Sequence, residues 1–228
     1  MTPNPIIVAL DFESASEAEA LVARLGNRVN FYKVGMELYA SAGMAFVRRL
    51  RDQGKDVFLD LKFYDIPETV RRAVCRVVPS GARFLTVHGS NTVMEAAAEA
   101  RGASNLKLLA VTVLTSFDRD DIRDLGYPCE VSDLVDLRVR KALASGMNGV
   151  VASPLDAARV RSLAGPDLLI VTPGVRSAGS AKGDQKRVAT PAEAIRDGAD
   201  YVVMGRQITR ALDPAGEVER VLEELAGA

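Results

Sequence analysis

The segment DVFLDLKFYDIP, residues 56–67, places a cluster of charges at the end of an apolar strand. Charged side chains are rarely fully buried unless they are paired. Residues two apart on a strand face the same side, so Asp60 and Lys62 are expected to project together. Asp65 follows beyond the strand, where spacing alone does not place it. The segment therefore predicts a strand that delivers opposite charges to one location.

Apolar, β-branched runs of this kind recur along the chain, at residues 6–11, 30–36, 56–62, 83–89, 106–114, 149–153, 168–174 and 201–206. Segments with apolar residues three or four positions apart, typical of helices, lie at 18–26, 46–54, 69–78, 93–102, 133–146, 157–165, 192–198 and 217–226. This alternation predicts an α/β fold with a parallel sheet covered by helices. We expect a (β/α)8 TIM barrel that forms a single domain over residues 1–228. A doubly wound sheet is the competitor, but no G-x-G-x-x-G follows the first strand.

Local signals support the helix boundaries. Ser14 with Glu17, and Thr190 with Glu193, have the spacing of capping boxes. Glycines follow several helical segments, as C-terminal caps do. The acidic run at 118–121 is expected in a loop or at a helix start. Cys75 is expected to pack in the core.

Composition excludes several classes of protein. The 228 residues include 29 Lys and Arg and 30 Asp and Glu, for a net charge of −1, so a nucleic-acid partner is not expected. No apolar stretch is long enough to suggest a membrane span, and no signal peptide is indicated. With only two cysteines, a disulfide framework is not expected and a cytoplasmic location is favoured.

Polar residues follow nearly every predicted strand. In (β/α)8 barrels, active sites form at the carboxyl ends of the strands. The residues at these positions are Asp11, Lys33, Asp60, Lys62, His88, Thr115, Pro173, Arg176, Gly205 and Arg206. They predict one polar site at one end of the barrel. No His, Cys or carboxylate group has the spacing of a metal site, so no metal is expected.

Lys62 lies between two carboxylates in the sequence, which should favour its ammonium form. It therefore suits the role of proton donor or electrostatic clamp better than that of a Schiff-base nucleophile. The alternative is an ion cluster that only satisfies itself. His88 could act as a general base, although a structural hydrogen-bonding role is favoured.

A second polar constellation is the basic, Gly- and Ser-rich stretch at 171–191. Loops after strands seven and eight of barrels often hold a phosphate, and Arg176 and Arg206 could add charge-assisted bonds. Long loops in compact domains are usually functional, so we expect a lid over residues 176–189. The alternative is an ordinary surface loop.

These residues resemble the orotidine 5'-phosphate decarboxylase family of bacterial pyrimidine synthesis. The resemblance covers essentially the whole chain. It rests on ALD (9–11), YKVG (32–35), DLKFYDIPETV (60–70), TVHG (86–89), VTVLTS (111–116), TPGVRSAGSAKGDQKR (172–187) and VVMGRQIT (202–209).

The resemblance implies decarboxylation of orotidine 5'-phosphate without a cofactor. Lys62 looks like the lysine that protonates C6 of the pyrimidine, Asp60 like the acid beside the departing carboxylate, and Lys33 like the ribose-binding lysine of the charge array. Asp65 resembles the acid that enters the neighbouring subunit's site across a homodimer. The matched substrate-binding positions are Asp11, Lys33, Asp60, Thr69, Thr115, Pro173, Arg176, Gln185, Gly205 and Arg206.

Two other functions are compatible with parts of the pattern. A magnesium-dependent 3-keto-gulonate 6-phosphate decarboxylase, or a related hexulose phosphate synthase, shares D-x-K-x-x-D after strand three but has a carboxylate where this chain has Lys33. A non-catalytic phosphate- or nucleotide-binding barrel would need the arginines but not the charged strand end.

Overall fold

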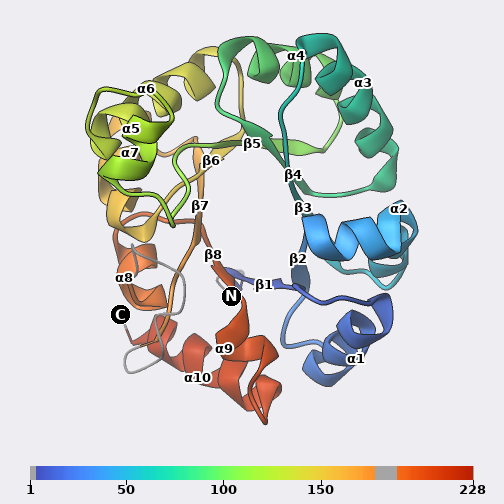
Figure 1. Cartoon of the computed structure of the whole chain (residues 1–228). Helices are drawn as coiled ribbons and strands as arrows, with labels where there is room; N and C mark the ends of the chain where they lie inside the picture. The colour runs from blue at the N-terminus through green and yellow to red at the C-terminus, as the bar shows by residue number, and fades with distance from the viewer. Residues whose placement is uncertain (1–3, 178–188, 228) are drawn as a thin grey trace.

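Eight parallel strands close into a barrel in chain order, with β8 paired to β1 (Figure 1). The computed structural model describes residues 4–177 and 189–227. The strands are β1 (Ile6–Ala9), β2 (Phe31–Gly35), β3 (Asp56–Phe63), β4 (Phe84–His88), β5 (Lys107–Val111), β6 (Gly149–Val151), β7 (Leu169–Pro173) and β8 (Tyr201–Met204). The predicted (β/α)8 architecture is confirmed.

Helices surround the strands on the outside of the barrel (Figure 1). The α-helices are α1 (Ala15–Leu25), α2 (Met36–Asp52), α3 (Pro67–Val77), α4 (Asn91–Arg101), α5 (Arg119–Asp124), α6 (Val131–Ala144), α7 (Ala157–Ala164), α8 (Pro191–Arg196), α9 (Arg206–Thr209) and α10 (Pro214–Ala226), with short 3-10 helices η1 (Val78–Ser80) and η2 (Pro154–Asp156). Each predicted helical segment corresponds to one of these helices, and the short helices α5 and α9 are additional.

Capping residues explain where several helices begin. The Thr190 hydroxyl accepts the N–H of Glu193, whose carboxylate accepts the N–H of Thr190 in return, which completes the predicted capping box. At α1 only half of the box forms, because Ser14 accepts the N–H of Glu17 and donates its own hydroxyl to the Glu17 carboxylate. Asp118 is the N-cap of α5, so the acidic run does start a helix.

Two apolar layers follow from the alternation of side chains along the strands. The inner layer fills the barrel and contains Ile7, Ala9, Phe31, Phe58, Phe84, Leu109, Val171 and Val203. The outer layer joins the strands to the helices. One prediction about it is wrong: α3 buries Val70, Val74 and Val77, whereas Cys75 is exposed.

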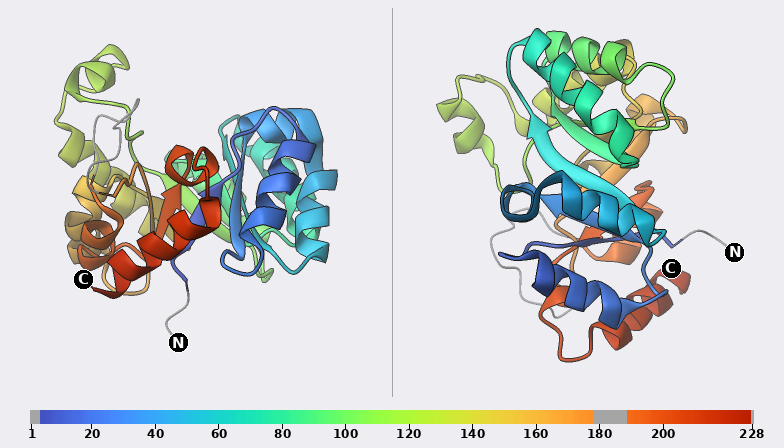
Figure 2. Two further views of the ribbon diagram at one scale, coloured as in Figure 1. Left: turned by 90° about the horizontal axis from the view of Figure 1, so that it is seen from below. Right: turned by 90° about the vertical axis from the view of Figure 1, so that its right-hand side faces the viewer.

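The two ends of the barrel differ in their surroundings. α5 rises from the end opposite to the start of β1, which is the end where the strands terminate (Figure 2). The βα connections that carry the polar residues predicted from the sequence lie at this carboxyl end. Within the described part of the chain, no helix has the length and apolar character needed to span a bilayer.

Candidate active site

A cavity of about 930 Å³ opens at the carboxyl end of the barrel. Nine of the predicted site residues line it: Asp11, Lys33, Asp60, Lys62, Thr115, Pro173, Arg176, Gly205 and Arg206. They come from positions at or after β1, β2, β3, β5, β7 and β8, so the closed barrel brings together residues from both halves of the chain. These nine residues therefore lie around one cavity at this end of the barrel.

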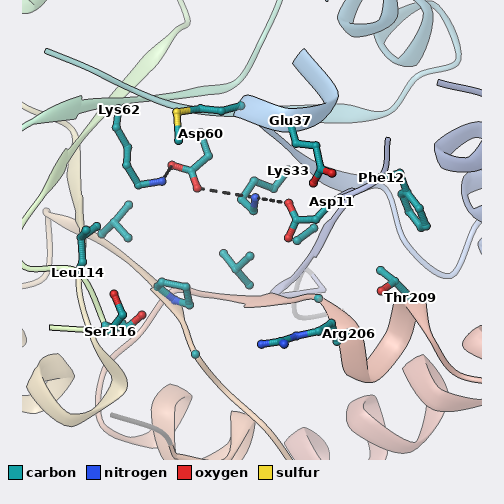
Figure 3. A pocket seen from close by; sticks show the side chains of 18 of the residues that line it. Asp11, Phe12, Lys33, Glu37, Asp60, Lys62, Leu114, Ser116, Arg206 and Thr209 are labelled. Atoms are coloured by element: carbon teal, nitrogen blue, oxygen red, sulfur yellow. Dashed lines mark hydrogen bonds and ion pairs between the residues drawn. The ribbon is translucent and has the colours of Figure 1, made fainter. Parts of the chain in front are cut away.

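Four charged groups of alternating sign form a chain along one side of the cavity (Figure 3). The Lys33 Nζ lies 3.0 Å from the Asp11 Oδ1 and 3.8 Å from the Asp60 Oδ2. The Lys62 Nζ lies 2.9 Å from the Asp60 Oδ1. Lys33 and Asp60 are largely buried, whereas the Lys62 side chain is 29% exposed. Lys62 is therefore the more accessible of the two lysines.

The surroundings of Asp60 keep it ionised. Burial raises the pKa of this carboxyl, but the opposing effects of Lys33 and Lys62, together with hydrogen bonds from Lys62 and Thr86, leave the pKa below its usual value. Asp60 therefore holds a negative charge in a poorly hydrated position, where charge interactions are stronger than in water.

The backbone at Lys62 departs from regular strand geometry. Lys62 has φ +48°, and it is the sole non-glycine residue with positive φ in the described ranges 4–177 and 189–227. The β3–β4 register pairs Leu59 with Leu85 and Phe63 with Val87, so four residue steps on β3 oppose two on β4. Such bulges re-aim side chains, and strained backbone of this kind is concentrated at functional sites. Asp60 and Lys62 do meet, but across a bulge that the two-residue period does not predict.

Gly35 leaves the space that the Asp11–Lys33 pair occupies. A Cβ atom at this position would lie 3.1 Å from the Lys33 Nζ and 3.2 Å from the Asp11 Oδ1. The φ of Gly35 is −88°, which any residue can adopt. The requirement for glycine therefore concerns space for the ion pair and not backbone conformation.

Arg206 lies across the cavity from the charge chain (Figure 3). It begins α9, directly after Gly205, which is the N-cap of that helix. Arg176 follows β7, and its backbone N–H binds Ala189 O at 3.0 Å. The cavity thus has alternating charges on one side and two guanidinium groups contributed by the connections after β7 and β8.

In the described part of the chain, three predicted residues do not line this cavity: Asp65, Thr69 and His88. Asp65 and Thr69 are exposed, one before α3 and the other in its first turn, and neither lines the cavity of this chain. Gln185 lies outside the described residues, as does most of the expected lid. His88 ends β4 but also does not line the cavity. The centroids of the His88 and Tyr64 rings lie 4.5 Å apart.

Sequence reasoning assigned no role to several residues at the site. Phe12, Glu37, Leu114 and Thr209 line the cavity. The sequence could have indicated them, because Leu114 ends a predicted strand and the other three follow one within three residues. Thr86, which contacts both Asp60 and Lys62, lies in the TVHG segment at 86–89 and was not expected at the site.

Comparisons with known proteins agree over nearly the whole chain. Residues 4–221 match the model of the Orotidine 5'-phosphate decarboxylase / HUMPS family. The chain is 51% identical over 223 residues to an orotidine 5'-phosphate decarboxylase of Rhodopseudomonas palustris (strain HaA2), with 98% of this chain and 95% of the relative covered. It is 50% identical over 228 residues to that of Caulobacter sp. (strain K31), with both chains fully covered. The crystal structure of orotidine 5'-phosphate decarboxylase from Lactobacillus acidophilus matches with a TM-score of 0.86 and 35% identity, over 97% of this chain and 99% of the other.

Proposed function

The chain belongs to the orotidine 5'-phosphate decarboxylase / HUMPS family, and from this premise we propose that it converts orotidine 5'-phosphate to uridine 5'-phosphate and carbon dioxide. This is the final step of de novo uridine monophosphate synthesis. The observation that carries the proposal is the chain of alternating charges Asp11–Lys33–Asp60–Lys62, set opposite arginines in one cavity.

Lys62 is proposed to stabilise and then protonate the carbon that loses the carboxyl group. When carbon dioxide leaves C6 of the pyrimidine, the bonding electrons remain on that carbon as a carbanion. An ammonium fixed nearby stabilises charge that grows only in the transition state, which raises the rate rather than merely the affinity. At 4 Å, two unit charges attract by about 4 kcal/mol at an effective dielectric constant near 20. One such contact is a useful part of the barrier reduction but not all of it.

Asp60 is proposed to orient Lys62 and to lie beside the substrate carboxylate. Its contact with Lys62 Nζ at 2.9 Å supports the first role. Its ionised state, maintained by the two lysines, supports the second, because two neighbouring carboxylates repel until one departs as neutral carbon dioxide. Lys33 and Asp11 are proposed to bind the ribose hydroxyl groups.

The opposite side of the cavity is proposed to bind the phosphate. Arg176 and Arg206 offer planar guanidinium groups that suit phosphate oxygens. Gly205, the N-cap of α9, lines the cavity beside Arg206 and is proposed to lie against the phosphate. Pro173 and Thr115 line the intervening wall, where the pyrimidine would lie, and Gln185 is proposed to contact the phosphate.

We propose a homodimer in which Asp65 and Thr69 serve the partner's site. Both residues are exposed on this chain and lie outside its own cavity. Their neighbours Tyr64 and Ile66 are large apolar residues that are 65% and 66% exposed. Exposed apolar side chains beside site-type polar residues support an interface here. A single-domain unit and a cytoplasmic location, compatible with the free cysteines, complete the proposal.

The magnesium-dependent alternative is disfavoured by Lys33. Its ammonium lies between the Asp11 and Asp60 carboxylates, so a positive charge contributed by the protein already occupies the space between them. A divalent ion there would be repelled.

The test is the ultraviolet absorbance change of orotidine 5'-phosphate in the presence of EDTA. The proposal expects full turnover. An absence of turnover by the folded protein would contradict it. Loss of activity in EDTA that magnesium restores, together with turnover of 3-keto-gulonate 6-phosphate, would favour the alternative function.

A further inference from the structure

Thr86 lies in the middle of β4, next to the irregular part of β3. It is fully buried, and it does not line the cavity. Along β4 it is two residues from Phe84, which belongs to the inner layer of the barrel, so Thr86 also faces inward. A buried threonine at an inward position has few possible partners, and the two shorter hydrogen bonds of Thr86 join it to Lys62 and Asp60.

The distances around the Thr86 hydroxyl favour one arrangement of hydrogen bonds. Its oxygen accepts the backbone N–H of Lys62 at 2.9 Å. Its proton is then available to an acceptor, and the Asp60 Oδ1 at 3.0 Å is better placed than Leu59 O at 3.5 Å. A single hydroxyl therefore accepts from one residue of the pair and donates to the other.

The position of this hydroxyl corresponds to the interruption of the strand ladder. Between Leu59 and Phe63 the β3–β4 register shifts, and regular strand pairing is lost. A buried backbone N–H without a partner is costly, and bulged residues are often left unpaired. Thr86 provides the acceptor for the N–H of Lys62, the residue with φ +48°. It thus stabilises the backbone conformation from which the Lys62 side chain extends.

Asp60 is fixed by the same contact. Its Oδ1 receives hydrogen bonds from the Lys62 Nζ at 2.9 Å and from Thr86, while its Oδ2 faces Lys33. These contacts define the rotation of the carboxylate and hence the direction in which Lys62 is held.

We propose that Thr86 is a positioning residue for the reaction, which fixes the Lys62 backbone and the Asp60 carboxylate relative to each other. The inference rests on the proposed roles of Lys62 and Asp60 in decarboxylation. It assigns Thr86 no contact with the substrate.

The experiment compares Thr86→Val, which keeps the shape and removes the hydroxyl, with Thr86→Ser, which keeps the hydroxyl. Misplacement of a catalytic group can cost on the order of 100-fold in rate, so Thr86→Val is expected to lower kcat by about that factor. KM should change little, because the arginine side of the cavity is untouched. Loss of a donor raises the pKa of Asp60, so the acid limb of the kcat profile should move to higher pH. Thr86→Ser should recover most of kcat.

Thr112→Val is the matched control. Thr112 is also fully buried, and its hydroxyl donates to Val151 O at 2.8 Å, away from the charge chain. The Thr112→Val substitution should therefore lower kcat far less than Thr86→Val does. Equal losses in the two variants, or a Thr86→Ser variant no more active than Thr86→Val, would overturn the inference.

A crystal structure of Thr86→Val separates this inference from the proposed function. The inference expects an altered Lys62 φ or a longer distance from the Lys62 Nζ to Asp60. An unchanged pair would overturn it even if the wild type failed to turn over orotidine 5'-phosphate, whereas such a failure alone would overturn the proposed function.

Discussion

Two aspartates of β3, Asp56 and Asp60, are each held between two cations, but at opposite ends of the barrel. At the amino end, Asp56 binds Arg51 and Arg83, each at 2.6 Å. At the carboxyl end, Asp60 lies between Lys62 at 2.9 Å and Lys33 at 3.8 Å. The two clusters therefore have the same alternation of charge and differ in what surrounds it.

In the amino-end cluster, Arg83 packs against aromatic rings of the barrel interior. The Arg83 guanidinium lies 5.2 to 5.6 Å from the ring centroids of Phe31, Phe84 and Tyr201, and it also donates to the Tyr201 hydroxyl. Arginine is always charged, and its planar group both stacks on rings and bridges acceptors. The carboxyl-end cluster instead uses lysines, which can donate a proton, beside an open cavity. We infer that ion pairs of equal charge pattern serve stability at one end and chemistry at the other.

The largest expected effect comes from removing Lys62. Lys62→Ala should lower kcat by about 1,000-fold or more, because the proton donor and the charge opposite the carbanion are both lost. Lys62→Gly should be equally inactive but more stable than Lys62→Ala by about 1 kcal/mol, because glycine adopts positive φ without strain. Turnover assays and urea unfolding measure the two effects.

Lys107→Ala is the control for this prediction, since it removes a lysine at the amino-end start of β5. It should retain turnover. Substantial activity in Lys62→Ala would mean that the carboxyl-end cluster is structural, like that at the amino end.

Arg83→Met should lower stability and leave turnover nearly unchanged, whereas Lys62→Ala should abolish most of the turnover. The free energy of unfolding should fall by about 1–2 kcal/mol, because the ring contacts and one ion pair are lost while the Arg51–Asp56 pair remains. The figure is modest because the Arg83 side chain is 38% exposed, which screens its charge. The kcat should stay near the wild-type value. A large fall in kcat without a loss of stability would show that the two ends are coupled.

The alternation of strands and the polar ends were predictable from the sequence because they depend on local periodicity. The backbone at Lys62 was not, since no sequence signal marks a lysine at positive φ. The position of Thr69 outside the cavity of this chain also escaped prediction, and spacing alone left Asp65 unplaced, because the direction of a loop depends on tertiary packing. Cys75 was misplaced because it is adjacent to Val74, and one residue of helical phase separates the core face from solvent.

Gly35→Ala tests how closely the carboxyl-end cluster is packed. The added methyl group would crowd the Lys33 Nζ and the Asp11 Oδ1, so the pair must shift by a few tenths of an ångström. We expect a fall in kcat/KM on the order of tenfold, with little loss of stability. Gly227→Ala is a useful comparison, because this glycine lies outside the cavity and its Cβ would make only ordinary contacts, the nearest at 3.6 Å to Glu223 O. Equal effects of both substitutions would argue against crowding of the ion pair.

The smallest expected effect on turnover is that of His88→Gln, which tests whether this carboxyl-end residue belongs to the charge cluster at all. His88 lies outside the cavity, so kcat should stay within about twofold of the wild type. Burial and the charge of Arg138 lower the pKa of His88 below 6.5. As the pH falls below 6.5, the unfolded chain takes up a proton that the folded chain does not, so the wild type should lose stability in that window. His88→Gln should lose less over the same range in urea unfolding at a series of pH values. A large fall in kcat would instead assign His88 to the chemistry, and an unchanged pH dependence would show that another group controls the acid sensitivity.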